Sequence, residues 1–258
     1  MALQNTSPTE RFADRVDDYV KYRPHYSPNV IKALQEHCEL SPRHLVVDVG
    51  CGTGLLAKIF VENGNRVIGV EPNENMRKAG EAYLLAHERF RMVDGTAENT
   101  GLLPESADFV VAGQAFHWFQ PAATRREFAR IVKSNGWVVL IWHEREMEAT
   151  PFLRDYEALL QRYATDYGTV AHNKVANYGA LEQFYAPDRM GFVEQATLQT
   201  FNYEGLRGRL LSSSYAPRHG PAADAMLAAL LELFHQYAKD GLVSMEYRTK
   251  IYIGHLTP

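Results

Sequence analysis

The segment from Leu45 to Glu71 constrains the fold of this chain more than any other. It reads LVVDVGCGTGLLAKIFVENGNRVIGVE. Apolar, β-rich residues run to Val49, a glycine-rich turn follows, and LLAKIFVEN then has the one-sided apolar pattern of a helix. Gly64 stands where such a helix ends, and VIGV is a second apolar run. This order predicts two parallel strands of an α/β sheet with a crossover helix between them.

The turn between the first strand and the helix contains Gly50, Gly52 and Gly54. Glycines lack the Cβ atom that would keep a ligand off the backbone, and they adopt dihedral angles closed to other residues. The free N–H groups and positive dipole end of the helix attract a carboxylate or a phosphate. Glu71, after the second strand, can accept hydrogen bonds from both hydroxyls of a ribose and would repel a 2′-phosphate. The segment therefore predicts a site for a nucleoside-containing cofactor.

The spacing of the glycines distinguishes between cofactors. A dinucleotide fingerprint G-x-G-x-x-G that begins at Gly50 needs a third glycine where the chain has Leu55. The run from Asp48 to Gly54 instead has the form D-x-G-x-G-x-G. It resembles motif I of the class I S-adenosylmethionine-dependent methyltransferases. A purely structural alternative stays open, because glycine-rich strand-to-helix turns occur in many α/β proteins.

The resemblance implies a cofactor, S-adenosyl-L-methionine, with S-adenosylhomocysteine as the product. In that family the glycine loop receives the methionyl part, the acid after the second strand holds the ribose, and a loop after the third strand contacts the adenine. The positions that the resemblance assigns to the cofactor are Tyr19, Arg23, Asp48, Gly50, Cys51, Gly52, Thr53, Gly54, Glu71, Pro72, Met76, Asp94, Thr96, Ala97 and Gln114.

The predicted adenine loop departs from the family pattern. The family often has Asp or Asn where this chain has Thr96, directly before Ala97. A hydroxyl accepts from an exocyclic amine more weakly than a carboxylate does. The backbone N–H of Ala97 and the carboxylate of Asp94 are therefore the other candidates, and residues 94–99 would also form a simple turn.

The N-terminal segment is polar and then rich in tyrosine. The pattern Y-x-x-x-R-P-x-Y from Tyr19 to Tyr26 resembles a family segment that folds over the cofactor. This implies that Arg23 holds a carboxylate with its planar fork of donors and that Tyr19 or Tyr26 borders the methyl group. The alternative is that the tyrosines pack as a lid without touching substrate.

Aromatic residues follow the predicted fourth strand, which ends near Gly113 and Gln114. Residues 115–119 read AFHWF, and ligands of open α/β sheets bind at the carboxyl edge of the strands. The run QAFHWF resembles the trans-aconitate methyltransferase-like branch of the family. It implies that His117 and Trp118 line the active site, with His117 as the base for a hydroxyl or amine acceptor. The alternative is that these rings seal the core.

The rest of the chain is expected to complete the sheet. The pattern predicts a helix over Pro121–Val132, a turn at residues 133–136 and a fifth strand over residues 137–142, with His143 and Glu144 just past its end. Helical residues 148–178, a short helix, a turn at Gly191, a strand over residues 193–203, an alanine-rich helix over residues 222–238 and a strand from Tyr247 to His255 follow. The expected fold is a Rossmann-like, doubly wound α/β sheet of seven mostly parallel strands with the last antiparallel, plus helical inserts that cover the substrate.

The expected organisation is a single methyltransferase domain over residues 1–258. It comprises an N-terminal lid (1–26), a cofactor-binding core (27–147), a helical insert with a late strand and substrate cap (148–246), and a final strand (247–258). Tyr215 and Arg218 belong to a candidate substrate lid that equally reads as a simple loop between helices. The expected substrate contacts are Arg23, Tyr26, Trp118, Tyr215 and Arg218.

Composition limits the partners. The formal net charge is −4 without a dense Lys/Arg run, which disfavours a nucleic-acid surface. Cys38 and Cys51 offer neither a disulfide framework nor a metal cluster, which fits a reducing compartment. No apolar run is longer than seven residues, far too short for a membrane span. We expect a cytoplasmic monomer or homodimer that acts on a small-molecule substrate, without metal, nucleic acid or membrane.

The sequence thus predicts an S-adenosylmethionine-dependent methyltransferase of a small molecule, with O-methylation of a carboxylic acid as the favoured reaction. A carboxylate is already anionic near neutral pH, so it needs no base. Two alternatives stay open. One is a non-catalytic S-adenosylmethionine-binding protein, and the other is a nicotinamide-dependent oxidoreductase, which Leu55 and the lack of a Tyr/Lys or zinc constellation disfavour.

Overall fold

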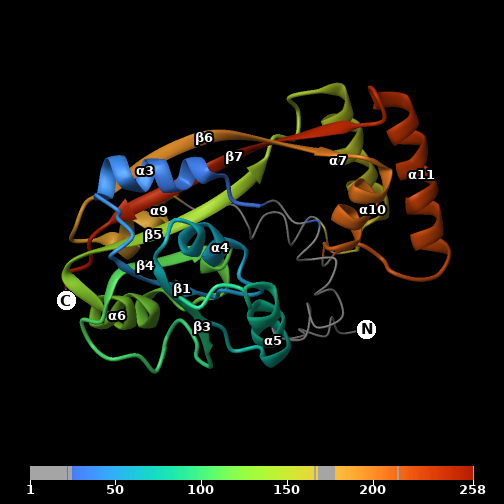
Figure 1. Ribbon diagram of the computed structural model, residues 1–258. Helices are drawn as coiled ribbons and strands as arrows, with labels where there is room; N and C mark the ends of the chain where they lie inside the picture. Colours follow the sequence, from blue (N-terminus) through green and yellow to red (C-terminus); the bar gives the residue numbers. More distant parts are fainter. Residues whose placement is uncertain (1–21, 23–24, 166, 168–177, 214, 258) are drawn as a thin grey trace, which may run out of the picture.

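The structure, a computed structural model, describes residues 22, 25–165, 167, 178–213 and 215–257 (Figure 1). The expectations for Tyr19 and Arg23 lie outside these residues.

One sheet of seven strands organises the molecule, in the order β3-β2-β1-β4-β5-β7-β6. The strands are β1 (Leu45–Val49), β2 (Arg66–Val70), β3 (Phe90–Val93), β4 (Ala107–Gly113), β5 (Val132–Arg145), β6 (Met190–Phe201) and β7 (Val243–Gly254). Strands β1 to β5 pair in parallel, and β7 runs antiparallel to both β5 and β6. The predicted fold class is confirmed. The order reverses between β1 and β4, and such a switch point is where open α/β sheets bind ligands.

The helices begin at the residues that local chemistry favours. They are α3 (Pro28–Cys38), α4 (Leu55–Glu62), α5 (Glu74–Tyr83), the 3₁₀ turn η2 (Phe116–Trp118), α6 (Pro121–Ile131), α7 (Pro151–Tyr163), α9 (Tyr178–Tyr185), α10 (Tyr203–Leu211) and α11 (Pro221–Tyr237). Ser27 caps α3 by accepting the Asn29 N–H, and Asn73 caps α5 by accepting the Met76 N–H. Both caps agree with the sequence, since these short side chains satisfy otherwise unpaired N–H groups.

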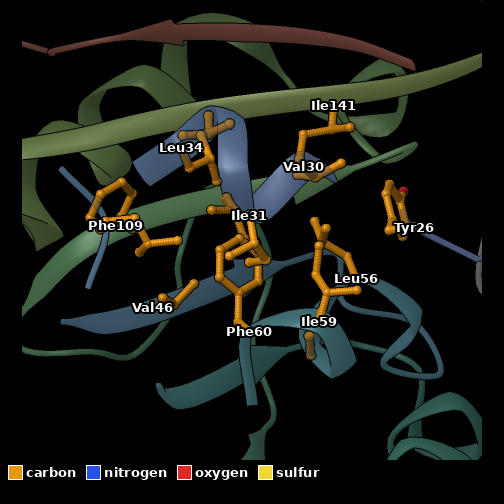
Figure 2. Packing of buried hydrophobic residues seen from close by; sticks show 14 of the residues in the cluster. Tyr26, Val30, Ile31, Leu34, Val46, Leu56, Ile59, Phe60, Phe109 and Ile141 are labelled. Atoms are coloured by element: carbon orange, nitrogen blue, oxygen red, sulfur yellow. The ribbon is translucent and has the colours of Figure 1, made fainter. Parts of the chain in front are cut away.

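Helices cover both faces of the sheet. Successive strand side chains point to opposite faces, so Val139 and Ile141 of β5 join the cluster under α3 and α4, whereas Val138 and Leu140 join the cluster that contains residues of α6 and α9. Figure 2 shows the first cluster, with the α3 side chains above the sheet and Tyr26 at its rim.

A second group of helices, α7, α10 and α11, forms a cap on the projecting ends of β6 and β7 (Figure 1). Phe201 of β6 and Met245 and Tyr247 of β7 pack with these helices in a third hydrophobic cluster. The cap therefore stands beyond the carboxyl end of β5, which pairs with β7 as far as Arg145 and Tyr247.

Three predicted boundaries are wrong. Residues 133–136 lie within β5, at an irregularity in its pairing with β4, rather than in a turn. His143 and Glu144 are inside β5, and Gly191 is inside β6 opposite Ile253. In each case pairing with a neighbouring strand extends regular structure through residues whose local preference is for a turn or a strand end. Among the described helices, none combines the length and the apolar character that crossing a membrane requires.

Candidate active site

The glycine loop lies between β1 and α4, at the carboxyl edge of the sheet. Gly50, Gly52 and Gly54 all have positive φ angles, of 68°, 57° and 84°. Their N–H groups donate within the protein, to Val70 O, the Glu71 carboxylate and Cys51 O. These three N–H groups are therefore not free to bind a ligand, because their hydrogen bonds within the protein stabilise the loop conformation.

The three glycines have different neighbours. A Cβ on Gly50 would lie 2.6 Å from the Ala115 Cβ, and one on Gly54 would lie 3.0 Å from Leu84. A Cβ on Gly52 would meet nothing within 4 Å. Gly50 and Gly54 therefore allow the loop to pack against the protein, whereas Gly52 alone presents bare backbone to open space.

Glu71 stands at the end of β2 and faces the loop. Its Oε2 accepts the Gly52 N–H at 3.0 Å, and its Oε1 accepts the Asn73 N–H at 3.0 Å. Burial raises the pKa of Glu71, while the two N–H groups and the charge of Arg77 oppose the rise. Each carboxylate oxygen has a second lone pair, so Glu71 can still accept hydrogen bonds from a diol.

Asp48 lies under the loop and is 1% exposed. Neither of its carboxylate oxygens has a hydrogen-bond partner of ordinary geometry among the described residues. Burial raises the pKa of Asp48 to about 7, although the Cys51 thiol and the Ala57 N–H lie near enough to oppose the rise. A carboxylate buried in this way is a mark of a ligand site, since burial without partners costs stability.

The Asp48→Asn variant should gain stability relative to the wild type as the pH rises. The folded-state pKa of about 7 lies above the ordinary value of 3.8, so the stability that the protonated Asp48 contributes is fully present below about pH 4 and is lost as the pH rises through 7. We expect a relative gain of about 4 kcal/mol between pH 4 and pH 8, since the two pKa values differ by about three units of about 1.4 kcal/mol each, and urea unfolding measures it. The pKa of Glu127 is lowered in the folded protein, so Glu127→Gln should show the opposite trend, and parallel trends would contradict the assignment.

The predicted adenine-side residues lie at the ends of β2 and β3. The Met76 side chain is buried. Ala97 is buried in the hydrophobic cluster that contains residues of α6 and α9. Thr96 Oγ1 accepts the Asn99 N–H, as expected for the simple turn. Asp94 is exposed and forms an ion pair with Arg77 at 2.9 Å.

Tyr26 brings the N-terminal segment to the carboxyl ends of β4 and β5. Its ring stacks on that of His143 with 4.4 Å between the centroids, and its hydroxyl lies over Gly113, the last residue of β4. The next residue, Gln114, has a φ of 54° and donates from Nε2 to the His143 carbonyl at 2.8 Å. A positive φ in a non-glycine residue is costly and is typical of functional sites.

A Gly113→Ala substitution should displace Tyr26. The new Cβ would lie 2.3 Å from the Tyr26 hydroxyl oxygen, and such overpacking costs about 1–3 kcal/mol. Thermal unfolding should show the loss, and the loss should shrink in a Tyr26→Phe background because the nearest atom is gone. Gly191→Ala, where the nearest atom is 3.6 Å away, is the matched strand control. Equal losses in the two backgrounds would show that Tyr26 is not the obstacle.

The aromatic run after β4 contains both buried and exposed rings. Phe116 is buried against Phe184 and Trp142. His117 is half-buried and stacks on Trp118 at 4.7 Å, and Trp118 is 41% exposed. The core alternative therefore holds for Phe116, and the active-site role of His117 and Trp118 stays a prediction.

The predicted lid residues Tyr215 and Arg218 follow α10. Tyr215 is buried in the cap cluster, and its ring lies 4.9 Å from that of Tyr167. Arg218 is half-buried.

The structure also reveals the surroundings of polar residues that the expected site did not include. His143 Nδ1 bonds the Thr249 hydroxyl at 2.8 Å, and burial lowers the pKa of His143 to about 4. Arg209 is buried beside the cap, and the Arg145 side chain there is 10% exposed. The sequence of β5 could have indicated His143 and Arg145, because these polar residues follow the apolar residues Val139 and Ile141 on the same face of the strand. Nothing local marks Arg209, which lies among ordinary helix residues.

A surface cavity of about 360 Å³ lies elsewhere, at the opposite edge of the sheet. Its lining includes Arg43, Arg66, Arg89 and Arg91 near the starts of β1, β2 and β3. The ligand site of a parallel sheet lies at the carboxyl ends of its strands, so the glycine loop is the better candidate.

Comparisons with known proteins show similarity to methyltransferases. The sequence pattern of the methyltransferase domain matches residues 47–140. An uncharacterized methyltransferase of Mycobacterium bovis is 32% identical over 151 residues, covering 58% of this chain and 59% of the relative. An uncharacterized methyltransferase of Schizosaccharomyces pombe is 29% identical over 158 residues, with coverage of 58% and 59%. The chain therefore matches little more than half the length of these relatives.

Solved structures share the fold. A protein of Anaeromyxobacter dehalogenans, provisionally named a type II methyltransferase, superposes with a TM-score of 0.67 at 22% identity, over 92% of this chain and 99% of that one. A Methanococcus maripaludis protein, provisionally named an S-adenosyl-L-methionine-dependent methyltransferase, gives a TM-score of 0.56 at 18% identity, over 75% and 92%. The chain is thus similar to methyltransferases over residues 47–140, and these solved structures share its fold.

Proposed function

We propose that this protein transfers a methyl group from S-adenosylmethionine to a small molecule, with a carboxylic acid as the favoured acceptor. One observation carries the proposal: the bare backbone of Gly52 faces open space directly beside the Glu71 carboxylate, which accepts its N–H. This pair offers a surface without side chains for an amino-acid tail and an acceptor for a sugar diol.

The residues present fit the cofactor. Gly52 would lie against the methionyl part, Glu71 would hold the ribose hydroxyls, and Thr96 and Ala97 would border the adenine. The orphaned carboxylate of Asp48 favours a cationic ligand near the loop. When bound, the cofactor supplies an electrophilic methyl group on a sulfonium. In a similar fold, a phosphoethanolamine methyltransferase of Haemonchus contortus (TM-score 0.50, 15% identity) was determined in complex with S-adenosylhomocysteine.

The protein's own residues then position the acceptor and exclude water. Alignment of the reacting groups contributes about 7–11 kcal/mol in well-oriented systems. Tyr26, stacked on His143, closes the site beside β4, and Trp118 lines it as a partly exposed ring. A carboxylate acceptor needs no base, whereas a hydroxyl or amine would use His117. Tyr215 and Arg218 stay candidates for contact with the substrate from the cap side.

A melting experiment tests the cofactor assignment. A ligand present at 100 times its dissociation constant stabilises a fold by about 2.7 kcal/mol, which is roughly 5–11 °C for a chain of this size. S-adenosylhomocysteine should produce this shift and NAD should not. A shift with NAD alone would instead favour the oxidoreductase.

Turnover separates an enzyme from a cofactor-binding protein. A panel of carboxylic acids incubated with S-adenosylmethionine should contain members that gain one methyl group by mass spectrometry, with matching formation of S-adenosylhomocysteine. Binding without transfer to any acid, alcohol or amine in the panel would favour the non-catalytic alternative.

A further inference from the structure

A belt of polar residues separates two hydrophobic clusters on one face of the sheet. On β5, Val139 and Ile141 belong to the cluster under α3, and the next two side chains on that face are His143 and Arg145. The facing residues of β7 change in the same way. Ile253 and Ile251 belong to the first cluster, Thr249 pairs with His143, and Tyr247 pairs with Arg145 and joins the cap cluster.

Arg209 of α10 meets this belt and carries a buried charge. It is 7% exposed, and its Nη1 donates to Ser213 Oγ at 3.0 Å while its Nε donates to Tyr247 Oη at 3.4 Å. These partners are neutral, and in the described part of the chain no carboxylate forms an ion pair with Arg209. Burial of a charge without a counter-ion costs several kcal/mol, so natural proteins keep one where a ligand compensates it.

Arg145 brings a second guanidinium to the same place. Its Nη2 pairs with Glu157 and donates to Tyr167 Oη at 3.2 Å, and its guanidinium lies 4.9 Å from the centre of the Tyr156 ring. Its Nε is buried without a hydrogen-bond partner among the residues described. Among the described residues, Glu157 is the one carboxylate paired with either guanidinium, and it pairs with Arg145. The belt therefore has a net positive charge.

The two arginines share Tyr247 as a neighbour, because Arg209 donates to its hydroxyl and Arg145 lies opposite it in the paired strands. Tyr156 is fully buried in the cap, and burial raises its pKa while the charges of both Arg209 and Arg145 oppose the rise. His143 adds no negative charge, and its Nε2 is also buried without a partner in the described residues. Its ring touches Tyr26 at the end of β4 and lies 6.5 Å from the Tyr247 ring. A line of contacts thus connects the candidate active site to Arg209.

We infer that Arg209 and Arg145 form an anion-binding subsite, which holds a carboxylate or phosphate group of the methyl acceptor. This inference rests on the proposed function and adds the place where the acceptor is anchored. The guanidinium fork matches planar or tetrahedral oxyanions, and the hydroxyls of Tyr247 and Ser213 fix the orientation of Arg209. Acceptors with a second anionic group, set apart from the reacting atom, are the substrate class that such a subsite selects.

Thermal unfolding with and without anions tests the subsite without any need for turnover. At matched ionic strength, sodium succinate and inorganic phosphate are each compared with chloride, for the wild type and for Arg209→Met. At least one of the two anions should raise the melting temperature of the wild type by several degrees more than that of Arg209→Met. A response to succinate alone would identify the bound group as a carboxylate. A response to phosphate alone would identify it as a phosphate.

A matched control lies on β7. Arg248 is half-exposed and pairs with Glu146 and Glu194, so Arg248→Met should keep the full response to anions. Arg209→Met removes an uncompensated buried charge and should melt without anions at or above the wild-type temperature. A purely structural arginine would behave in the opposite way. Arg209→Lys should retain part of the response, because it keeps the charge but loses the fork.

Two results would overturn the inference. One is an equal anion response in the wild type and Arg209→Met, and the other is an Arg209→Met protein that folds less stably while the wild type does not respond to either anion. Both are independent of the cofactor. If S-adenosylhomocysteine still stabilises the protein in that case, the proposed function stands and only the subsite fails. If S-adenosylhomocysteine has no effect, the proposed function fails whatever the anions do.

With an acceptor in hand, kinetics provide the second readout. Arg209→Met should raise the KM for an anionic acceptor by about 10- to 100-fold and leave the KM for S-adenosylmethionine within about twofold. A fall in kcat with an unchanged acceptor KM would place Arg209 outside the binding of the anion.

Discussion

Replacing Gly52 by valine is expected to abolish the binding of S-adenosylhomocysteine, with a loss of more than about 100-fold in affinity. The backbone of Gly52 has a φ of 57°, and the space on its Cβ side is open. A branched side chain there would occupy the volume that a ligand needs to reach the loop. Isothermal titration calorimetry of the purified variant measures the effect.

Gly101→Val is the matched control for this substitution. Gly101 has a φ of 69° and also has nothing within 4 Å of its Cβ position, but it lies before β4 and away from the glycine loop. Both variants should lose about 1–3 kcal/mol of stability, because a branched residue is strained in this conformation. Only Gly52→Val should lose the ligand. Binding retained in Gly52→Val would remove the loop from the cofactor site.

Replacing Glu71 by alanine is expected to lower the affinity for S-adenosylhomocysteine by about 10²- to 10⁴-fold. The carboxylate would accept hydrogen bonds from two ribose hydroxyls, and bonds to a charged group contribute roughly 1.5–3 kcal/mol each. The variant also frees the N–H groups of Gly52 and Asn73, which Glu71 holds at 3.0 Å. Calorimetry gives the affinity, and thermal unfolding gives the cost to the loop.

Two further variants separate these effects. Glu71→Gln keeps an acceptor oxygen but not the charge, so its affinity should lie between those of the wild type and Glu71→Ala. Glu127 is a buried carboxylate that accepts the Thr100 N–H at 2.8 Å, away from the loop, and Glu127→Gln should lower stability without changing affinity. An unchanged affinity in Glu71→Ala would exclude Glu71 from the ribose role.

The glycine loop illustrates how far sequence reasoning reaches. Spacing alone was enough to expect a turn with positive φ angles at Gly50, Gly52 and Gly54, and all three have them. Spacing did not reveal that only Gly52 faces open space. That difference depends on Ala115 and Leu84, which reach the loop from later segments of the chain.

The aromatic segments show a similar division. The sequence places residues 115–119 at the end of a strand, but periodicity cannot decide which ring of a short irregular turn enters the core. Packing against Phe184 of α9 buries Phe116 and leaves Trp118 at the surface. Tyr26 was expected over the active site, and the structure adds its partner, His143, which the sequence placed just past a strand.

The order of the secondary structure elements, the glycine turn and the helix caps follow from the sequence itself, because each depends on the conformational preferences of a few adjacent residues. The resemblance to methyltransferases was recognisable for the same reason, since the motif that carries it is short and continuous. The tertiary structure alone brought Arg145 of β5 and Arg209 of α10 together beside Tyr247. Burial, and with it the cost of an unpaired charge, is set by contacts between segments that are far apart in the chain, and no local pattern encodes it.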